Sequence, residues 1–229
     1  MKLRNQLIAL VSFTLLAFST VYFYLTLHSV IDKWILYKEL STTVQVDNYD
    51  GVSGSGVFVS KRGHILSCAH IFTQQRTRKK NNRRSGTDII TVTTYNGVMM
   101  GAKLVRLDKN SDLALLYLDR SKPWKCYCAI LIDKDLTLGE FVRVIGYPLD
   151  LGITVTEGIV SGEKRFDNTT QTNAVINPGN SGGPVFDKHG NLVGLSEFIY
   201  PVPLFVGQSF FIPASRIKKF LEEMEAGQR

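Results

Sequence analysis

Short apolar runs, each bounded by turn-forming residues, recur along most of the chain and restrict its fold more than any other feature. Within them, apolar residues are continuous or alternate with polar ones, as in β-strands. No long helical pattern interrupts them, and strands at roughly even spacing favour an all-β barrel or sandwich. With 44% hydrophobic residues among 229, the chain can bury a sizeable core. The expected strands are residues 42–46, 54–59, 89–95, 98–107, 113–118, 129–132, 141–146, 153–161, 174–176, 184–186, 192–199 and 209–212.

Residues 173–184, Asn-Ala-Val-Ile-Asn-Pro-Gly-Asn-Ser-Gly-Gly-Pro, have the composition of a loop that presents a nucleophilic serine. Glycine precedes Ser181 by two positions and follows it twice, so the backbone can adopt positive φ angles there. The N–H groups of Gly179 and Ser181, with Asn180 between them, form the candidate oxyanion hole. Each donor of this kind contributes on the order of 3 kcal/mol. The alternative is an ordinary loop between two strands, because the same residues dominate turns.

A serine hydroxyl becomes an effective nucleophile when a base accepts its proton and a third group orients the base. The sequence offers His70 at the end of Ser67-Cys68-Ala69-His70, and Asp112 near the start of Ser111-Asp112-Leu113-Ala114-Leu115-Leu116. Histidine titrates near neutral pH, so His70 is the candidate general base. Asp112 would accept the other imidazole N–H, although an aspartate before a strand is also a common turn residue.

With these three residues in the order His, Asp, Ser, the chain resembles the trypsin-like serine proteases and, within them, the HtrA/Deg branch. The resemblance extends from about Val44 to Ile217. Its motifs are Gly54-Ser55-Gly56-Val57-Phe58-Val59, Ala69-His70, Ser111-Asp112-Leu113-Ala114-Leu115, Val144-Ile145-Gly146-Tyr147-Pro148, Val155-Thr156-Glu157-Gly158-Ile159-Val160-Ser161 and the serine loop.

The resemblance implies two antiparallel, chymotrypsin-like β-barrels with the site between them. It also implies a serine endopeptidase that hydrolyses peptide bonds of exported or misfolded proteins through an acyl-enzyme, with no cofactor. Pro123 stands among polar residues and suits a linker, so we expect the first barrel over residues 42–122 and the second over 123–229. The competing interpretation is a catalytically idle or latent module that binds proteins or acts as a chaperone.

No charged residue occurs in residues 7–27, which is about the length that a helix needs to cross hydrocarbon. Lys2 and Arg4 precede this run, so we expect the rest of the chain to lie outside the cytoplasm, which would be the periplasm if the cell is Gram-negative. We therefore expect residues 1–30 to form a cytoplasmic end and a transmembrane signal anchor. A cleaved signal peptide competes, because Ala17-Phe18-Ser19 resembles a cleavage site, but the apolar run continues beyond it.

Residues 31–41 mix aromatic and charged side chains, which suits either a juxtamembrane segment at the membrane interface or a linker helix packed on the barrels. Related enzymes often form trimers through residues ahead of the first barrel, so a homotrimer is an open alternative. At the other end, apolar residues spaced as in a helix between Ile217 and Met224 predict an amphipathic helix from Ser215 to about Gly227. HtrA-type proteases commonly continue into PDZ domains, and we expect none here.

The formal net charge of +7 comes largely from one basic stretch. We interpret it first as a solvated loop, and alternatively as a contact with anionic lipid headgroups, where each cation adds about 1 kcal/mol. It lacks the interleaved aromatic residues of a nucleic-acid site, so no nucleic-acid partner is expected. The cations of this basic stretch are Arg76, Arg78, Lys79, Lys80, Arg83 and Arg84.

Three cysteines do not make a disulfide framework. Cys126 and Cys128 are two positions apart, which points them to opposite faces of a strand. Cys68 is expected to pack as a small apolar residue beneath His70. No spacing typical of a zinc site is present, so we predict no metal.

The pocket for the side chain before the scissile bond is expected between two walls, most of whose residues are apolar. This predicts a preference for small or medium aliphatic side chains. Glu197 departs from the resemblance, because related chains tend to carry a small hydroxyl residue at about this place: either our register is off by one residue, or the Glu197 carboxylate favours a basic side chain. The predicted wall residues are Val175, Asn177 and Pro178 on one side and Leu195, Ser196, Glu197 and Phe198 on the other.

Overall fold

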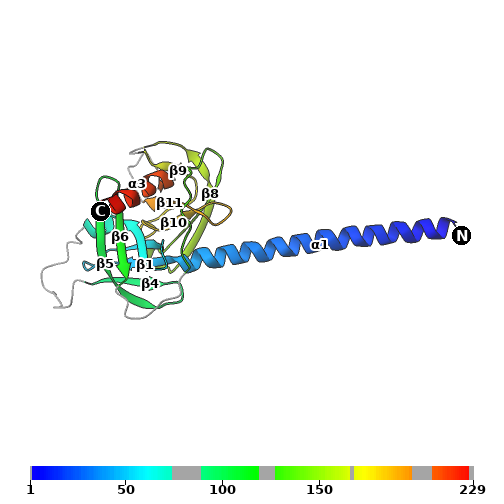
Figure 1. Ribbon diagram of the computed structural model, residues 1–229, viewed down its shortest axis with the longest axis horizontal. Helices are drawn as coiled ribbons and strands as arrows, with labels where there is room; N and C mark the ends of the chain where they lie inside the picture. Colours follow the sequence, from blue (N-terminus) through cyan, green and yellow to red (C-terminus); the bar gives the residue numbers. More distant parts are fainter. Residues whose placement is uncertain (1, 74–88, 119–126, 166–167, 198–207, 227–229) are drawn as a thin grey trace. The chain divides into compact units, whose positions relative to one another are not determined.

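The computed structural model describes residues 2–73, 89–118, 127–165, 168–197 and 208–226 (Figure 1). The chain divides into two compact units, Met1–Tyr37 and Lys38–Arg229. The cations of the basic stretch, together with Phe198, Cys126 and Gly227, lie outside the described residues.

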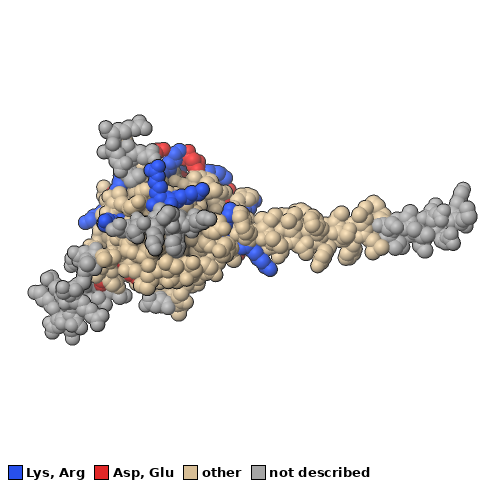
Figure 2. Space-filling view, turned by 60° about the horizontal axis from the view of Figure 1, so that its bottom comes forward, with Lys and Arg blue, Asp and Glu red and all other residues tan. Residues whose placement is uncertain are grey.

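The first unit belongs to a single long helix, α1 (Lys2–Thr42). Neither proline nor glycine occurs before Gly51, so nothing in the sequence breaks the helix, and it continues through residues 31–41. Among the described residues, one helical stretch, Phe13–Thr42, is long and apolar enough to cross a membrane, judged by length and composition. Its residues 13–31 carry no charged side chain, and most of the described length of α1 shows neither blue nor red in Figure 2.

Six antiparallel strands close the first barrel in the order β1-β2-β3-β6-β5-β4. The last residue of β3 is followed within two positions by a one-turn helix, α2 (His70–Thr73). The strands are β1 (Thr43–Asp47), β2 (Ser53–Phe58), β3 (His64–Cys68), β4 (Ile90–Thr94), β5 (Met99–Asp108) and β6 (Leu113–Leu118).

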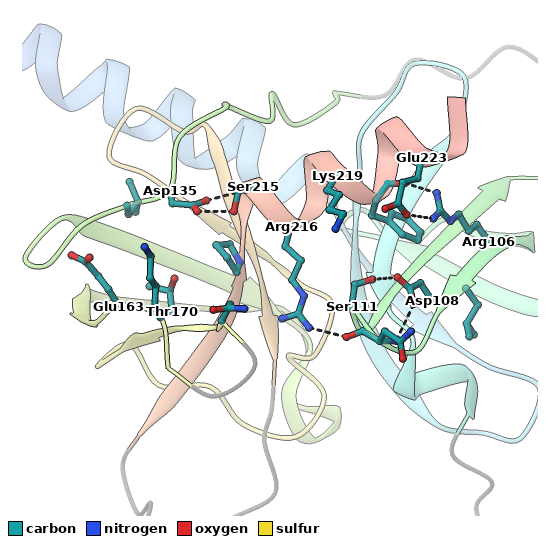
Figure 3. A pocket seen from close by; sticks show the side chains of 17 residues that line it. Arg106, Asp108, Ser111, Asp135, Glu163, Thr170, Ser215, Arg216, Lys219 and Glu223 are labelled. Carbon is teal, nitrogen blue, oxygen red and sulfur yellow. Dashed lines mark hydrogen bonds and ion pairs between the residues drawn. The ribbon is translucent and has the colours of Figure 1, made fainter. Parts of the chain in front are cut away.

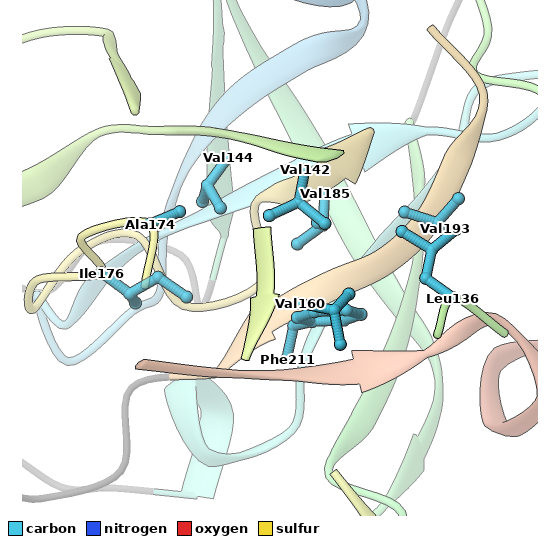
Figure 4. Packing of buried hydrophobic residues seen from close by; sticks show 9 residues of the cluster. All are labelled: Leu136, Val142, Val144, Val160, Ala174, Ile176, Val185, Val193 and Phe211. Carbon is cyan, nitrogen blue, oxygen red and sulfur yellow. The ribbon is translucent and has the colours of Figure 1, made fainter. Parts of the chain in front are cut away.

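Six further antiparallel strands close the second barrel in the order β10-β11-β12-β9-β8-β7, which confirms the predicted two-barrel fold. Its core cluster consists of aliphatic side chains together with Phe211, which lies beside Val160 in Figure 4. A short 3-10 helix, η1 (Pro148–Asp150), follows the first of these strands, and the C-terminal helix α3 (Ala214–Ala226) follows the last. The strands are β7 (Phe141–Gly146), β8 (Thr154–Gly162), β9 (Thr170–Thr172), β10 (Pro184–Phe186), β11 (Leu192–Glu197) and β12 (Ser209–Pro213).

Two predicted strands are wrong. Residues 174–176 are not a strand, because side chains replace the strand ladder there: the Thr172 hydroxyl accepts the Ala174 N–H and the Asn173 side chain accepts the Ile159 N–H. Ala174 and Ile176 are apolar because they enter the core, at 0% and 6% exposure. Residues 129–132 form only an isolated bridge, between Leu131 and Leu192.

The predicted amphipathic C-terminal helix is confirmed as α3. On this helix, Ile217 and Phe220 are buried while Glu222 and Glu223 are exposed, as the spacing of apolar residues predicts.

Candidate active site

The pairing of β3 with β6 places His70 beside Asp112. Cys68 pairs with Leu113, so the next residues along each strand, Ala69 and Asp112, also meet, and the Ala69 N–H donates to the Asp112 carbonyl (3.1 Å). The Asp112 carboxylate accepts the His70 backbone N–H at Oδ1 (2.8 Å) and lies 2.7 Å from His70 Nδ1 at Oδ2. An ionised carboxylate only accepts, so Nδ1 carries the proton of a neutral ring and Nε2 is left as the basic nitrogen.

Asp112 adopts a φ of 50°, in the left-handed region that non-glycine residues rarely occupy. That conformation costs roughly 1–2 kcal/mol and persists only where surrounding contacts fix it. The three hydrogen bonds from residues 69–70 supply part of that restraint.

The serine loop is folded by its own backbone. The Asn180 N–H donates to the Asn177 carbonyl (3.0 Å), and the Gly183 N–H donates to the Asn180 carbonyl (2.8 Å). Gly179 and Gly182 have φ angles of 101° and 81°, which favour glycine. A Cβ on Gly182 would lie 2.4 Å from the Ser55 carbonyl oxygen and 2.8 Å from the Cys68 nitrogen. The residue after Ser181 therefore lies against the segment that leads into His70.

Ser55, on β2 of the first barrel, connects to this loop at two points. Its N–H donates to the Ser181 carbonyl (2.8 Å), and its hydroxyl donates to the Gly179 carbonyl (2.7 Å) while accepting the Tyr147 N–H (2.9 Å). Ser55 is completely buried. Our reading of the sequence missed this function, although small residues at Gly54, Ser55 and Gly56 within an apolar strand indicate a close backbone approach.

The carbonyl groups of the loop determine where its N–H groups point, because the C=O and N–H of a trans peptide lie on opposite sides. The Pro178 carbonyl accepts the Leu149 N–H (3.1 Å), which turns the Gly179 N–H away from Leu149. The Asn180 carbonyl accepts the Ser196 hydroxyl (2.5 Å), which turns the Ser181 N–H away from Ser196. The Asn180 N–H, included in the predicted oxyanion hole, is instead committed to Asn177.

The residues predicted to line the specificity pocket differ in accessibility. Val175 is 55% exposed, and Asn177 and Pro178 are also exposed. Leu195 and Ser196 have 0% exposure. Ser196 fastens the serine loop, since its carbonyl accepts the Gly182 N–H and its N–H donates to the Gly183 carbonyl, both at 2.8 Å.

The predicted position of Cys68 in the core is confirmed, with 0% exposure, and its thiol lies 3.5 Å from the Ser196 carbonyl. Burial raises the Cys68 pKa well above its usual range, and the negative charges of Asp112 and Glu197 raise it further. Candidate ligand atoms of Cys68, His70 and Asp112 lie within 4.8 Å of one another. They do not fit a metal ion, because a thiol with a raised pKa resists becoming the thiolate that metals require, and the other two groups bond each other.

Two closed six-stranded barrels, with a histidine–aspartate pair on the first and a glycine-rich serine loop on the second, define a protein of the chymotrypsin-like class. The family model described as a trypsin-like peptidase domain matches residues 54–195, more than half of the chain. The chain belongs to this family.

Relatives of the HtrA/Deg type confirm the branch that the motifs indicate. A probable periplasmic serine endoprotease, DegP-like, from Brucella suis is 34% identical over 178 residues, which are 75% of this chain and 32% of the relative. Serine protease HTRA3 from Rattus norvegicus is 35% identical over 185 residues, covering 76% of this chain and 38% of the relative. The chain thus spans about a third of the length of such curated relatives.

A solved structure supports the fold independently. The serine endoprotease from Yersinia pestis superimposes with a TM-score of 0.68 at 32% sequence identity, covering 85% of this chain and 66% of that one.

Proposed function

We propose that the chain is a serine endopeptidase in which Ser181, His70 and Asp112 form the catalytic triad. The observation that carries the proposal is the double contact of His70 with one carboxylate, through its backbone N–H (2.8 Å) and Nδ1 (2.7 Å). This contact sets both the position and the tautomer of the imidazole, and the Ser181 loop lies against the segment that leads into it.

In the proposed reaction, Ser181 Oγ attacks the carbonyl carbon of the substrate while His70 Nε2 takes the hydroxyl proton. Asp112 stabilises the imidazolium that forms, without taking the proton itself. The imidazolium then protonates the leaving amine, and the peptide bond breaks to leave an ester on Ser181. A water molecule, deprotonated by His70, hydrolyses this acyl-enzyme and restores the free serine.

The oxyanion is proposed to bind the N–H groups of Gly179 and Ser181. Support comes from the fixed carbonyls on either side: the Pro178 carbonyl is held by Leu149, and the Asn180 carbonyl by Ser196 and Gly183. Donors that are fixed before the substrate arrives need no reorganisation during the reaction, which is the condition for strong electrostatic stabilisation.

We propose exported or misfolded proteins as substrates, acted on outside the cytoplasm by an enzyme tethered through residues 7–27. Two facts support the placement: α1 has the length and composition of a membrane span, and the Brucella relative is described as probably periplasmic. Carbonate extraction should leave the full chain in the membrane, and protease added to spheroplasts should digest the residues after α1. Release by carbonate or full protection would contradict the tether.

Two further proposals concern partners: contact of the basic stretch with anionic lipid, and assembly into a homotrimer. Nanodiscs test the first proposal, and light scattering tests the second. If the cations contact lipid, discs of anionic lipid should slow proteolytic cleavage within residues 76–84 relative to neutral discs, whereas equal cleavage would refute the contact. Light scattering of the detergent-solubilised chain measures its mass against the 25.7 kDa of one copy.

Activity-based labelling tests the triad directly. The full chain in detergent should react with a fluorophosphonate probe and cleave an unfolded protein. Ser181→Ala should do neither, whereas Ser161→Ala, which removes an exposed serine of β8, should behave as the wild type. A wild-type chain that neither reacts nor cleaves would favour the idle binding module instead.

A further inference from the structure

Helix α3 is fastened at its start to the segment that precedes the second barrel. The Ser215 N–H and hydroxyl both donate to the Asp135 carboxylate, at 2.9 and 2.6 Å, which satisfies groups of the first helical turn. Lys218, one turn further along, forms an ion pair with Asp133. The first turns of α3 are therefore held in a fixed position (Figure 3).

The same helix also reaches the first barrel. Arg106, on β5, donates to the Phe220 carbonyl (2.5 Å), pairs with Glu223 (2.8 Å) and lies 4.4 Å from the centre of the Phe220 ring. A second arginine, Arg216, belongs to α3 itself and extends toward the first barrel, where its Nη2 donates to the Asn110 carbonyl (3.0 Å). Figure 3 shows Arg216 pointing from the helix to the turn beside Ser111.

The turn that receives Arg216 leads directly into Asp112. The Asp108 carboxylate folds this turn by accepting the Asn110 N–H (2.9 Å) and the Ser111 hydroxyl (2.6 Å). Asp112 then takes its left-handed conformation, which external contacts must maintain. An open groove of about 1090 Å³ adjoins the turn, with Asn110, Ser111, Arg216 and Lys219 among its lining residues.

We infer that Arg216 is a positioning residue, which holds the turn from α3 so that the Asp112 carboxylate stays aligned with His70. The inference rests on the proposed triad. The bond joins a charged donor to a backbone carbonyl, the stronger kind of hydrogen bond. One side of the turn faces an open groove, so packed side chains do not restrain it there. The hydrogen bond from Arg216 to the Asn110 carbonyl supplies that restraint.

Kinetics of the full chain in detergent, with active sites counted by fluorophosphonate titration, test this inference. Arg216→Ala should lower kcat roughly tenfold, the size expected from losing one hydrogen bond to a charged group, and leave KM within about twofold. The low-field proton resonance of the His70–Asp112 hydrogen bond should broaden or shift. Arg216→Lys should restore part of kcat, because a lysine keeps one charged donor. The matched control is Lys219→Ala, which removes an exposed cation of the same helix and groove and should match the wild type.

An Arg216→Ala chain with wild-type kcat, or with low kcat but an unchanged resonance, would overturn the positioning role. Should Arg216→Ala fail to fold, Arg216→Met decides, because it keeps the length of the side chain and removes the donor to the Asn110 carbonyl: wild-type kcat and an unchanged resonance in that variant would overturn the positioning role. Failure of the proposed function looks different: either the wild type would neither react with the probe nor cleave, or Ser181→Ala would keep the activity of the wild type. Loss of activity in Ser181→Ala together with a wild-type Arg216→Ala would refute only the inference.

Discussion

Replacing Ser55 with alanine should weaken both the fold and the hydrolysis of substrate, because one buried hydroxyl serves two backbone groups around the serine loop. The Gly179 carbonyl loses its donor at 2.7 Å and the Tyr147 N–H loses its acceptor at 2.9 Å. Leaving a buried polar group without its partner costs about 1–3 kcal/mol. Two groups lose a partner, but Tyr147 is only half-buried, so water can partly replace the lost acceptor of its N–H. We therefore expect a loss of about 2–4 kcal/mol in the free energy of unfolding.

The effect on catalysis follows from the position of Gly179. Removing an oxyanion donor altogether lowers kcat by about 10²–10³. Ser55→Ala keeps the Gly179 N–H but leaves the Gly179 carbonyl, on the next peptide, without its donor. We therefore expect kcat/KM to fall by roughly 10 to 100-fold. The measurements are urea denaturation followed by tryptophan fluorescence, and hydrolysis of a fluorogenic peptide by titrated enzyme.

Ser53→Ala is the matched control for Ser55→Ala. Ser53 lies on the same strand, and its hydroxyl donates to Asp47 (2.5 Å), not to the serine loop. This variant should keep kcat/KM within about twofold of the wild type, because surface-proximal changes away from a site have small effects. Wild-type hydrolysis by Ser55→Ala, or an equal loss in Ser53→Ala, would refute the proposed link between the barrels.

Three further outcomes are expected. Gly182→Ala should abolish detectable hydrolysis and lower the unfolding midpoint, because its φ is 81° and a Cβ would lie 2.4 Å from the Ser55 oxygen; soluble, active protein would contradict this. Burial raises the Tyr147 pKa to about 12, so the folded state keeps that proton longer than the unfolded state and this contribution to stability falls as pH rises from 10 to 12. The melting temperature of Tyr147→Phe should fall less steeply over that range than that of the wild type, and an identical slope in the two proteins would contradict the raised Tyr147 pKa. A peptide panel should show cleavage after small or medium aliphatic residues; a strong preference for arginine that Glu197→Ala removes would instead favour the charged pocket.

Some strands were predicted with the bounds that the structure gives them, whereas β3 and β9 were not predicted. Residues 113–118, 141–146 and 184–186 have the predicted bounds because mostly apolar runs, interrupted in these three segments by Arg143, coincide there with barrel strands. Residues 174–176 have a similar apolar composition but enter the core from a loop, and composition alone does not distinguish these cases. The sequence likewise contains no proline or glycine before Gly51, and α1 continues through residues 31–41 as one helix.

The pairing of His70 with Asp112 was anticipated from the order of the motifs and their resemblance to those of the trypsin-like proteases, and the structure accounts for it because β3 and β6 are neighbours. The contacts of Ser55, Asn180 and Arg216 could not. Ser55 and Gly179 are 124 residues apart, and Arg216 and Asn110 are 106 apart. Hydrogen bonds over such separations leave no periodic pattern in the sequence, since they depend on how two finished barrels meet.

Each barrel therefore restrains the part of the proposed triad that the other carries. Ser55 of the first barrel holds the loop that contains Ser181, while Arg216, which follows the last strand of the second barrel, holds the turn before Asp112. Apolar burial within each barrel forms the strands, whereas the hydrogen bonds of Ser55 and Arg216 are polar and directional, so they set alignment more than stability. A small change in how the barrels dock would consequently lower turnover while leaving both cores intact, which makes the contacts between barrels, and α3 in particular, the natural place to modulate activity.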